Sequence, residues 1–391
     1  MKRRNFMTGL TSGILGLGLA KAGGAADASR KSLQDGAAPK VKTYNPFGKT
    51  GLKVSDVSCG AISLFEPNVL RYAYECGVNY FDTAEGYLRT KSESFIGQAL
   101  KDVRDQVIIT TKHWQDFSSK IEKARVIERV EASLKRLQTE HLDVALVHNV
   151  DDLTPLLKNE ELLSAYDQLK KDGKVRFTGF STHNAKVTLK QALETDFPQV
   201  VLVIYNHMEG PQIEPLIKEV RKKGIATVAM KVMAGGAQGN LKSLVNQEVS
   251  YPQASIRWVL SNPDVDCCIP TMSSYAHVEE YIAASGKPLD RASLKLIASY
   301  QKQAQHLYCR VSCKECLPAC PHHVAVNDVL RYAMYYENYG IEKEAIRYYA
   351  ELAPGQKAIF CSQCSGPCES ACPHGLRVKE KLIHSHEILS V

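Results

Sequence analysis

The chain lacks the features that mark nucleic-acid-binding and membrane proteins. Its 49 basic and 42 acidic residues leave a net charge of +7 over 391 residues, and no lysine- and arginine-rich block resembles a nucleic-acid-binding arm. No apolar stretch is long and charge-free enough to span a membrane. Only four of the twelve cysteines, Cys59, Cys76, Cys267 and Cys268, lie in the first 300 residues. We therefore expect a globular protein that neither binds nucleic acid nor inserts stably into a membrane.

Residues 1–28 have the pattern of an export signal. A basic start, Lys2-Arg3-Arg4, precedes a weakly apolar stretch, Phe6–Leu19, and small residues with two possible cleavage sites follow. The string RRNFM resembles a twin-arginine signal, with a general-secretion signal and a buried helix as the alternatives. This stretch has no cysteine, which excludes a lipid anchor at a cleavage-site cysteine. We expect an exported, periplasmic protein in which residues 29–40 form a flexible linker.

Residues 41–303 alternate short apolar runs with longer amphipathic segments. The eight runs are VSCG, VNYFD, VIITTK, LDVALVH, VRFTGFS, VVLVIYN, IATVAMK and DCCIP. They are continuous and rich in β-branched residues, as strands buried on both faces should be. Between them, apolar residues recur at helical spacing, for example within Ile121–Leu137.

This alternation predicts an α/β fold, a (β/α)8 TIM barrel. A doubly wound open sheet is the alternative, but no G-x-G-x-x-G follows the first strand. The segment Val41–Ser55, with PFGKTG at its centre, predicts a hairpin in front of the barrel.

Polar residues stand at the ends of three neighbouring predicted strands. Asp82 ends VNYFD, Lys112 ends VIITTK and His148 ends LDVALVH, while Tyr87 follows Asp82 in the next loop. Chemistry in a barrel takes place at the carboxyl ends of the strands. An ammonium should lower the pKa of a nearby phenol, a carboxylate should hold that ammonium in place, and a histidine can hydrogen-bond a carbonyl. A salt bridge or capping role at the barrel mouth is the alternative for each residue taken singly.

The strings GVNYFDTAEGY, IITTK and LVH resemble the aldo/keto reductase family, and the resemblance covers roughly residues 44–285. It implies hydride transfer between a nicotinamide cofactor and a carbonyl or alcohol. Tyr87 would be the proton donor, Lys112 and Asp82 would tune it, and His148 would orient the substrate.

The resemblance also implies a set of cofactor-binding residues. Many relatives place an aromatic residue on the nicotinamide after the seventh strand, where VAMKVMAGG has Met230. The last loop, IPTMSSYAHVEEY, has no lysine or arginine for a 2′-phosphate. We therefore expect NAD(P)(H) with a preference for NAD. The cofactor-binding residues implied are Ser181, Asn206, Met230, Lys231, Thr271, His277 and Glu280.

Residues 304–391 contain two runs of four cysteines, CRVSCKECLPACP and CSQCSGPCESACP, around a helical segment. Thiolates select iron–sulfur clusters or zinc, and three close cysteines plus a later Cys-Pro is the bacterial ferredoxin arrangement. Each run has one residue more than that arrangement, so zinc and disulfides are alternatives. We expect a small, mainly helical ferredoxin-type domain with two [4Fe–4S] clusters. One would be held by Cys309, Cys313, Cys316 and Cys372, and the other by Cys361, Cys364, Cys368 and Cys320.

A barrel of this family with a twin-arginine-type signal and a ferredoxin-type tail resembles a known subgroup. It implies an oxidoreductase acting on a small carbonyl compound or sugar, with clusters that exchange electrons with a redox partner protein or a quinone-linked chain. One alternative is a conventional NAD(P)H-dependent carbonyl reductase with structural clusters or zinc. Another is a non-catalytic electron-transfer or binding protein on a barrel scaffold.

Overall fold

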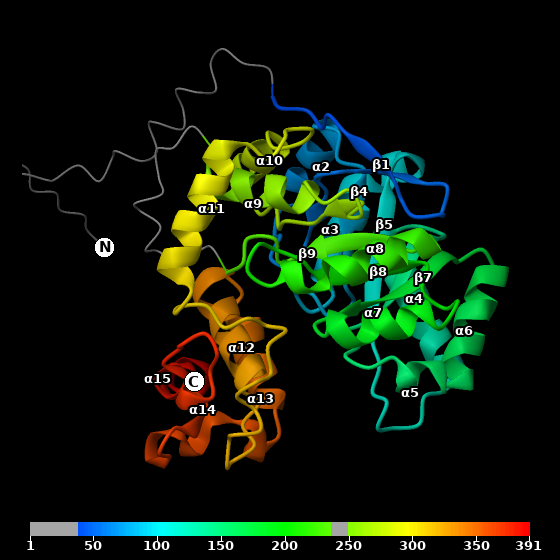
Figure 1. Ribbon diagram of the computed structural model, residues 1–391. Helices are drawn as coiled ribbons and strands as arrows, with labels where there is room; N and C mark the ends of the chain where they lie inside the picture. The colour runs from blue at the N-terminus through cyan, green and yellow to red at the C-terminus, as the bar shows by residue number, and fades with distance from the viewer. Residues whose placement is uncertain (1–37, 236–248) are drawn as a thin grey trace, which may run out of the picture. The chain divides into compact units, whose positions relative to one another are not determined.

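Eight parallel strands form the centre of the fold in the computed structural model, which describes residues 38–235 and 249–391 (Figure 1). The sheet order is β10-β9-β8-β7-β6-β5-β4-β3, and isolated bridges from Val57 to Cys268 and from Gly60 to Thr271 join its two edges. The predicted barrel is therefore confirmed. The strands are β3 (Cys59–Gly60), β4 (Tyr80–Asp82), β5 (Ile108–Trp114), β6 (Leu142–His148), β7 (Val175–Thr182), β8 (Val200–Ile204), β9 (Ala226–Met230) and β10 (Cys267–Cys268).

The predicted hairpin precedes the barrel and covers the end where the strands begin. It consists of β1 (Tyr44–Pro46) and β2 (Lys53–Ser55), which pair in antiparallel register. Phe47, in the turn, is fully buried in a cluster with first residues of several barrel strands, among them Tyr80 at 5.4 Å between ring centroids. Gly48 has φ +54°, and a Cβ there would lie 2.6 Å from backbone atoms of Gly224 and Ala226. Only glycine suits this close approach.

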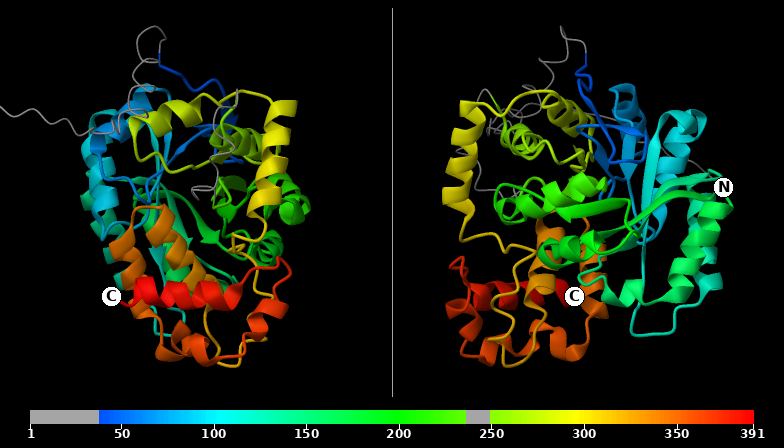
Figure 2. Two further views of the ribbon diagram at one scale, coloured as in Figure 1. Left: turned by 90° about the vertical axis from the view of Figure 1, so that its left-hand side faces the viewer. Right: turned by 45° about the vertical axis from the view of Figure 1, so that its right-hand side comes forward.

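Helices lie outside the strands, as Figure 2 shows. In α4 the buried residues Val126, Val130, Leu134 and Leu137 recur at helical spacing, so one face packs on the barrel. None of the helices within the described residues combines the length and hydrophobicity needed to cross a bilayer. The barrel helices are α2 (Pro67–Glu75), α3 (Lys91–Leu100), α4 (Lys123–Leu137), α5 (Thr154–Leu157), α6 (Glu160–Lys171), α7 (Ala185–Leu193), α8 (Glu214–Lys223), α9 (Tyr251–Leu260) and α10 (Tyr275–Ile282), with short 3₁₀ turns η1 (Lys101–Gln106) and η2 (Gly210–Ile213).

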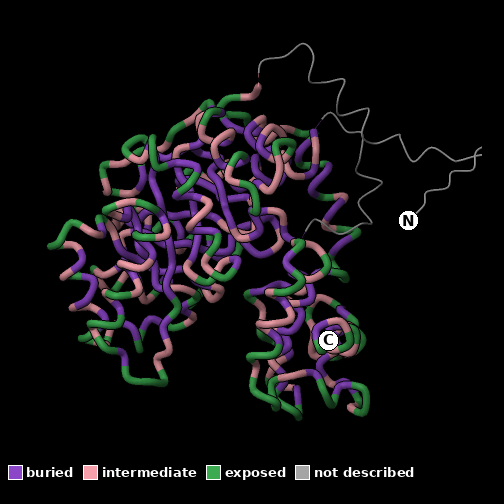
Figure 3. Tube along the Cα trace, turned by 180° about the vertical axis from the view of Figure 1, so that it is seen from behind, coloured by how far each residue is buried: buried purple, intermediate pink, exposed green. Residues whose placement is uncertain are grey.

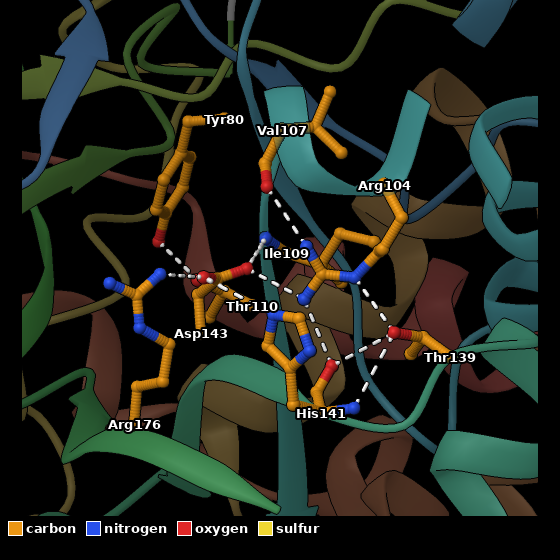
Figure 4. Close-up of polar contacts among 9 residues, drawn as sticks. All are labelled: Tyr80, Arg104, Val107, Ile109, Thr110, Thr139, His141, Asp143 and Arg176. Carbon is orange, nitrogen blue, oxygen red and sulfur yellow. Dashed lines mark hydrogen bonds and ion pairs between the residues drawn. The ribbon is translucent and has the colours of Figure 1, made fainter. Parts of the chain in front are cut away.

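A buried ion network lies at the end of the barrel where the strands begin (Figure 4). Asp143, the second residue of β6, accepts hydrogen bonds from Arg104 Nη2 at 2.7 Å, Arg176 Nη1 at 2.7 Å and the backbone N–H of Ile109 at 3.0 Å. Its side chain is 2% exposed. In barrels this end contributes stability, because active sites form at the opposite end.

The C-terminal region is helical, as predicted. It contains α11 (Arg291–Ala304), α12 (Val326–Asn338), α13 (Glu342–Glu351), η4 (Pro354–Gln356), η5 (Ala358–Gln363), α14 (Pro367–Ser370) and α15 (Val378–Leu389). The segment between the cysteine runs is broken at Gly340, whose φ of +65° ends α12.

This region shares a hydrophobic core with the barrel. Val326 and Leu382 belong to the same buried cluster as Leu88, Ala234 and Tyr251. In Figure 3, buried residues occur along the trace of the barrel and along that of the C-terminal region. Residues 39–391 form one compact unit, so the predicted division near residue 303 stays a prediction. The predicted export signal and most of the predicted linker lie outside the described residues.

Candidate active site at the barrel mouth

Neighbouring strand ends bring an ion pair to the mouth of the barrel. Asp82 ends β4, and Lys112 is the fifth residue of the adjacent strand β5. Lys112 Nζ lies 2.6 Å from Asp82 Oδ1 and also donates to the backbone carbonyl of Thr83 at 2.6 Å. The two side chains are 1% and 3% exposed. Such a buried pair is held together because neither charge is stabilised by water.

Tyr87 and His148 join this pair. Lys112 Nζ lies 4.9 Å from the centroid of the Tyr87 ring, and the His148 ring meets that ring edge-on at 5.8 Å between centroids. The three residues after Tyr87, Leu88–Thr90, all have positive φ, between +51° and +72°. Strained loop backbone of this kind is common where a side chain is held for a function. The four residues proposed from the strand ends therefore converge in space.

Burial dominates the electrostatics of the site. It raises the pKa of Tyr87 well above its ordinary value, and the charge of Asp82 adds to this. We expected Lys112 to lower this pKa, but its ammonium lies over the face of the Tyr87 ring, and burial outweighs it. Burial and the positive charge of Lys112 lower the pKa of His148 to about 3. At neutral pH the site therefore presents a protonated phenol and a neutral imidazole.

The ion pair is subject to opposing effects. Burial raises the pKa of Asp82, while the attraction of Lys112 opposes the rise. Burial likewise lowers the pKa of Lys112, and Asp82 opposes that change. Asp82 Oδ2 is buried without a hydrogen-bond partner among the described residues. The mouth thus keeps a free acceptor beside the proposed proton donor.

A cavity of about 350 Å³ opens beside this group. Seven of the predicted site residues line it: Asp82, Tyr87, Met230, Lys231, Thr271, His277 and Glu280. Lys112 and His148 do not line the cavity. They contact Asp82 and Tyr87, which do. The cavity extends from the proposed proton donor to the last loop of the barrel, which is the direction in which a nicotinamide dinucleotide would lie under the family resemblance.

Ser181 and Asn206, two of the predicted cofactor-binding residues, do not line the cavity. Ser181 Oγ accepts the backbone N–H of Asn149 at 2.9 Å. Asn206 Nδ2 donates to the carbonyl of Lys231 at 3.1 Å, and its Oδ1 accepts the backbone N–H groups of Met208 and Glu209. Asn206 therefore orders the neighbouring loops, and its role toward a cofactor stays a prediction.

The last loop offers little positive charge for a 2′-phosphate. His277 Nδ1 lies 3.0 Å from Ser273 Oγ, and its ring stacks on Tyr281 with centroids 5.2 Å apart. Burial lowers the pKa of His277, so the ring is uncharged at neutral pH. Among the described residues that line the cavity, Lys231 is the one lysine or arginine.

Several of the eight tail cysteines raise one another's pKa. Burial raises the pKa of Cys316 to about 11, with the neighbouring thiols of Cys372 and Cys313 adding to the rise. Burial also raises that of Cys361 to about 11, with contributions from Cys320, Cys368 and Cys364. The pKa of Cys309 is raised by burial and by Cys316, Cys313 and Cys372. Cys368, which the prediction assigns to the other group, also adds to the pKa of Cys316, so the division of the ligands into two groups stays a prediction.

All twelve cysteines are free thiols. Within residues 38–235 and 249–391, no group of three or more His, Cys, Asp or Glu side chains is placed to hold a metal ion. The predicted ligand geometry is therefore not formed, and the two clusters stay a prediction. Ligation requires thiolates, and ligand geometry in small metal domains commonly forms with binding.

The C-terminal region supplies residues to the mouth that the sequence did not reveal. Asn338 and Tyr339 line the cavity, and Tyr335 Oη accepts a hydrogen bond from Lys231 Nζ at 3.1 Å. Arg331, one turn earlier, contacts His183. These four residues share one helical face. Their helical spacing was the sequence signal that could have grouped them. Periodicity alone does not say what such a face packs against.

Comparison with known proteins agrees with this geometry. The model of the aldo/keto reductase family matches residues 65–302. The chain belongs to the aldo/keto reductase family. It is similar to an uncharacterized oxidoreductase, YqkF, of Bacillus subtilis (25% identity, covering 66% of this chain and 96% of YqkF). It is also similar to L-galactose dehydrogenase of Arabidopsis thaliana (28% identity, covering 61% and 86%).

A solved structure supports the same assignment. The thermostable aldo-keto reductase Tm1743, in complex with the inhibitor epalrestat, is 26% identical and has a TM-score of 0.56. The match covers 66% of this chain and 99% of Tm1743. Membership of this family makes the protein an oxidoreductase. The family match ends before the cysteine-rich tail, so α12 to α15 are additions to the matched barrel.

Proposed function

We propose that this aldo/keto reductase interconverts a small carbonyl compound and its alcohol, with Tyr87 as the proton donor. The observation that carries the proposal is the buried Lys112–Asp82 pair, 2.6 Å apart, beneath Tyr87 at the edge of the cavity. Tyr87 is protonated at neutral pH and so has a proton to give to a carbonyl oxygen, although the raised pKa makes it a weaker acid than a free tyrosine. Neutral His148 beside the Tyr87 ring is available to orient that oxygen by a hydrogen bond.

The cofactor proposed is NAD(H) in preference to NADP(H). When bound, the nicotinamide supplies or accepts the hydride. Met230 ends β9 in the cavity wall and offers a thioether surface for a ring, while Lys231 follows it as a cation for a phosphate. Thr271 and uncharged His277 leave the far end without charge for a 2′-phosphate, and Glu280 offers a polar group for the adenosine.

Two [4Fe–4S] clusters are proposed for the tail, with Cys309, Cys313, Cys316 and Cys372 holding one and Cys361, Cys364, Cys368 and Cys320 the other. What supports the proposal is the sequence pattern, in which each run of four cysteines ends in Cys-Pro, together with the electrostatic effect of Cys372 on Cys309 and Cys316 and of Cys320 on Cys361. When bound, such clusters exchange single electrons. We propose a redox partner protein or quinone-linked chain as their outside partner. We also propose periplasmic export in the folded state through a twin-arginine signal, with cofactors already bound.

The activity is tested with anaerobically purified protein, NADH or NADPH, and a panel of aldehydes, ketones and sugars. Sugars belong in the panel because L-galactose dehydrogenase is among the relatives. We expect turnover that Tyr87→Phe reduces by about 10²- to 10⁴-fold. Tyr166→Phe is the control, since Tyr166 is a buried tyrosine outside the cavity and its hydroxyl has no hydrogen-bond partner among the described residues. Unchanged turnover in Tyr87→Phe would exclude the mechanism.

The clusters are tested by iron and acid-labile sulfide analysis of the same preparation. Cys372→Ser should remove the iron assigned to the first group and leave the second, although Cys372 lies in the second run. Cys76→Ser, a buried cysteine of the barrel, is the control. A zinc-only preparation, or loss of iron from the second group in Cys372→Ser, would contradict the assignment.

A further inference from the structure

One face of α12 lies against the barrel mouth. Arg331, Tyr335, Asn338 and Tyr339 follow the i, i+4, i+7, i+8 spacing of a single helical face. Arg331 Nη1 lies 2.9 Å from Nδ1 of His183, which follows β7, and Tyr335 accepts from Lys231, which follows β9. The helix is thus held to the ends of two barrel strands. It lies beyond residue 302, where the family match stops, so this contact is a property of the added region.

The same face approaches the proposed proton donor. Tyr335, on this face, accepts a hydrogen bond from Lys231 in the cavity wall, and its phenol adds to the burial-raised pKa of Tyr87. Tyr339 and Asn338 also line the cavity that Tyr87 lines. A carbonyl held by Tyr87 would therefore have α12 as one of its neighbours.

Asn338 has an unused hydrogen-bond donor at this place. Its Nδ2 is buried from water and has no partner among the described residues. An unpaired buried amide is unfavourable, and in native proteins it calls for an explanation. Asp82 lines the same cavity, with its Oδ2 as a buried acceptor that also has no partner. A hydroxyl group both donates and accepts, so a hydroxylated ligand matches both orphaned groups.

We propose that Asn338 is a substrate-binding residue that selects polyhydroxylated substrates by donating a hydrogen bond to a substrate hydroxyl. The inference rests on the proposed carbonyl–alcohol activity and names its substrate class. An unpaired donor and an unpaired acceptor in one cavity match a hydroxyl better than an anion, which could only accept. Asn338 and the proposed proton donor Tyr87 line the same cavity, which favours a group of the substrate as the acceptor.

The test compares two substrates and three variants. The substrates are an aldose and an aliphatic aldehyde of the same chain length. Asn338→Leu removes the amide at similar size, and Asn338→Asp keeps its shape but loses the donor at neutral pH. Glu337→Gln is the control, because Glu337 is 43% exposed and pairs with His384 on α15. We expect both Asn338 variants to lower the preference for the aldose, in kcat/KM, about five- to tenfold, with Glu337→Gln unchanged.

Calorimetric binding separates this inference from the proposed function. The Kd of NADH should be unchanged in Asn338→Leu, whereas the Kd of a sugar alcohol for the NAD-loaded protein should rise five- to tenfold. A weaker NADH Kd with an unchanged substrate preference would assign the donor to the cofactor and overturn the proposal. Equal sugar-alcohol binding by wild type and both variants would also overturn it. Should the wild type turn over no carbonyl or alcohol, the proposed activity fails while the binding measurement still decides the role of Asn338.

Discussion

Two buried aspartates at opposite ends of the same barrel differ in how many of their carboxylate oxygens have hydrogen-bond partners. Asp143, at the start of β6, accepts hydrogen bonds from two arginines and a backbone N–H (Figure 4). Asp82, at the end of β4, is paired with Lys112 alone, and its second carboxylate oxygen has no partner among the described residues. A carboxylate whose acceptor sites are filled stabilises a fold. One that keeps an unfilled site beside a cavity has capacity left for a ligand.

The difference follows the direction of the strands. Backbone and side chains close the end where the strands begin, with Phe47 of the hairpin buried against Tyr80. At the other end the loops leave a cavity between Tyr87 and Thr271. We therefore expect changes at the Asp143 end to alter stability without altering catalysis, and changes at the Asp82 end to alter catalysis above all.

Lys112→Met should have the largest effect, because it removes the ammonium beneath Tyr87 and leaves Asp82 buried without its counter-charge. We expect turnover to fall by at least about 100-fold and the free energy of unfolding to fall by about 3–5 kcal/mol. Steady-state kinetics and urea unfolding measure the two effects. Normal turnover in a folded Lys112→Met protein would remove the ion pair from the mechanism.

Asp143→Asn should affect stability alone. The change leaves the guanidinium of Arg104, which is 10% exposed, without its carboxylate, while Arg176, 45% exposed, turns to solvent. We expect a loss of about 2–4 kcal/mol in the free energy of unfolding, with kcat per folded molecule unchanged. Asp196→Asn is the control, since that carboxylate is fully exposed. A drop in kcat without unfolding would show that the two ends are coupled.

His148 should make the stability of the mouth sensitive to acid. Burial and Lys112 lower its pKa to about 3, against about 6.5 in an unfolded chain. The folded state thus prefers neutral histidine, so this contribution is present above pH 6.5 and is lost as the pH falls toward about 3. His148→Gln should therefore flatten the loss of unfolding free energy between pH 6.5 and pH 4. Because His207, with a pKa lowered to about 4, acts in the same direction, we expect only part of the slope to disappear.

The smallest expected effect concerns the choice of cofactor. Thr271→Arg places a guanidinium in a cavity wall that has no lysine or arginine at that end among the described residues. One charge-assisted hydrogen bond to a 2′-phosphate should improve the Kd of NADPH about tenfold, with the Kd of NADH little changed. Fluorescence titration with both cofactors measures the ratio. A wild-type protein that already prefers NADPH strongly would contradict the expected preference for NAD.

Much of the barrel was predictable because buried parallel strands have a direct sequence pattern. All eight apolar runs became strands, and α4 (Lys123–Leu137) lies within the stretch Ile121–Leu137 that showed helical spacing. The convergence of Asp82, Lys112 and His148 was predictable as well, since parallel strands end on the same side. The direction in which the pKa of Tyr87 shifts was not predictable. It depends on the burial of the phenol and on tyrosines more than 240 residues away in the chain.

The sequence by itself determined the alternation of strands and helices, the placing of the polar residues at strand ends, and the two cysteine runs. These depend on local spacing, which the chain order carries. Only the tertiary structure decided that the face of α12 covers the barrel mouth, that Asn206 orders a loop, and that Asp82 and Asn338 keep unpaired atoms beside one cavity. Burial and hydrogen-bond satisfaction depend on residues distant in the chain, so no local pattern reports them.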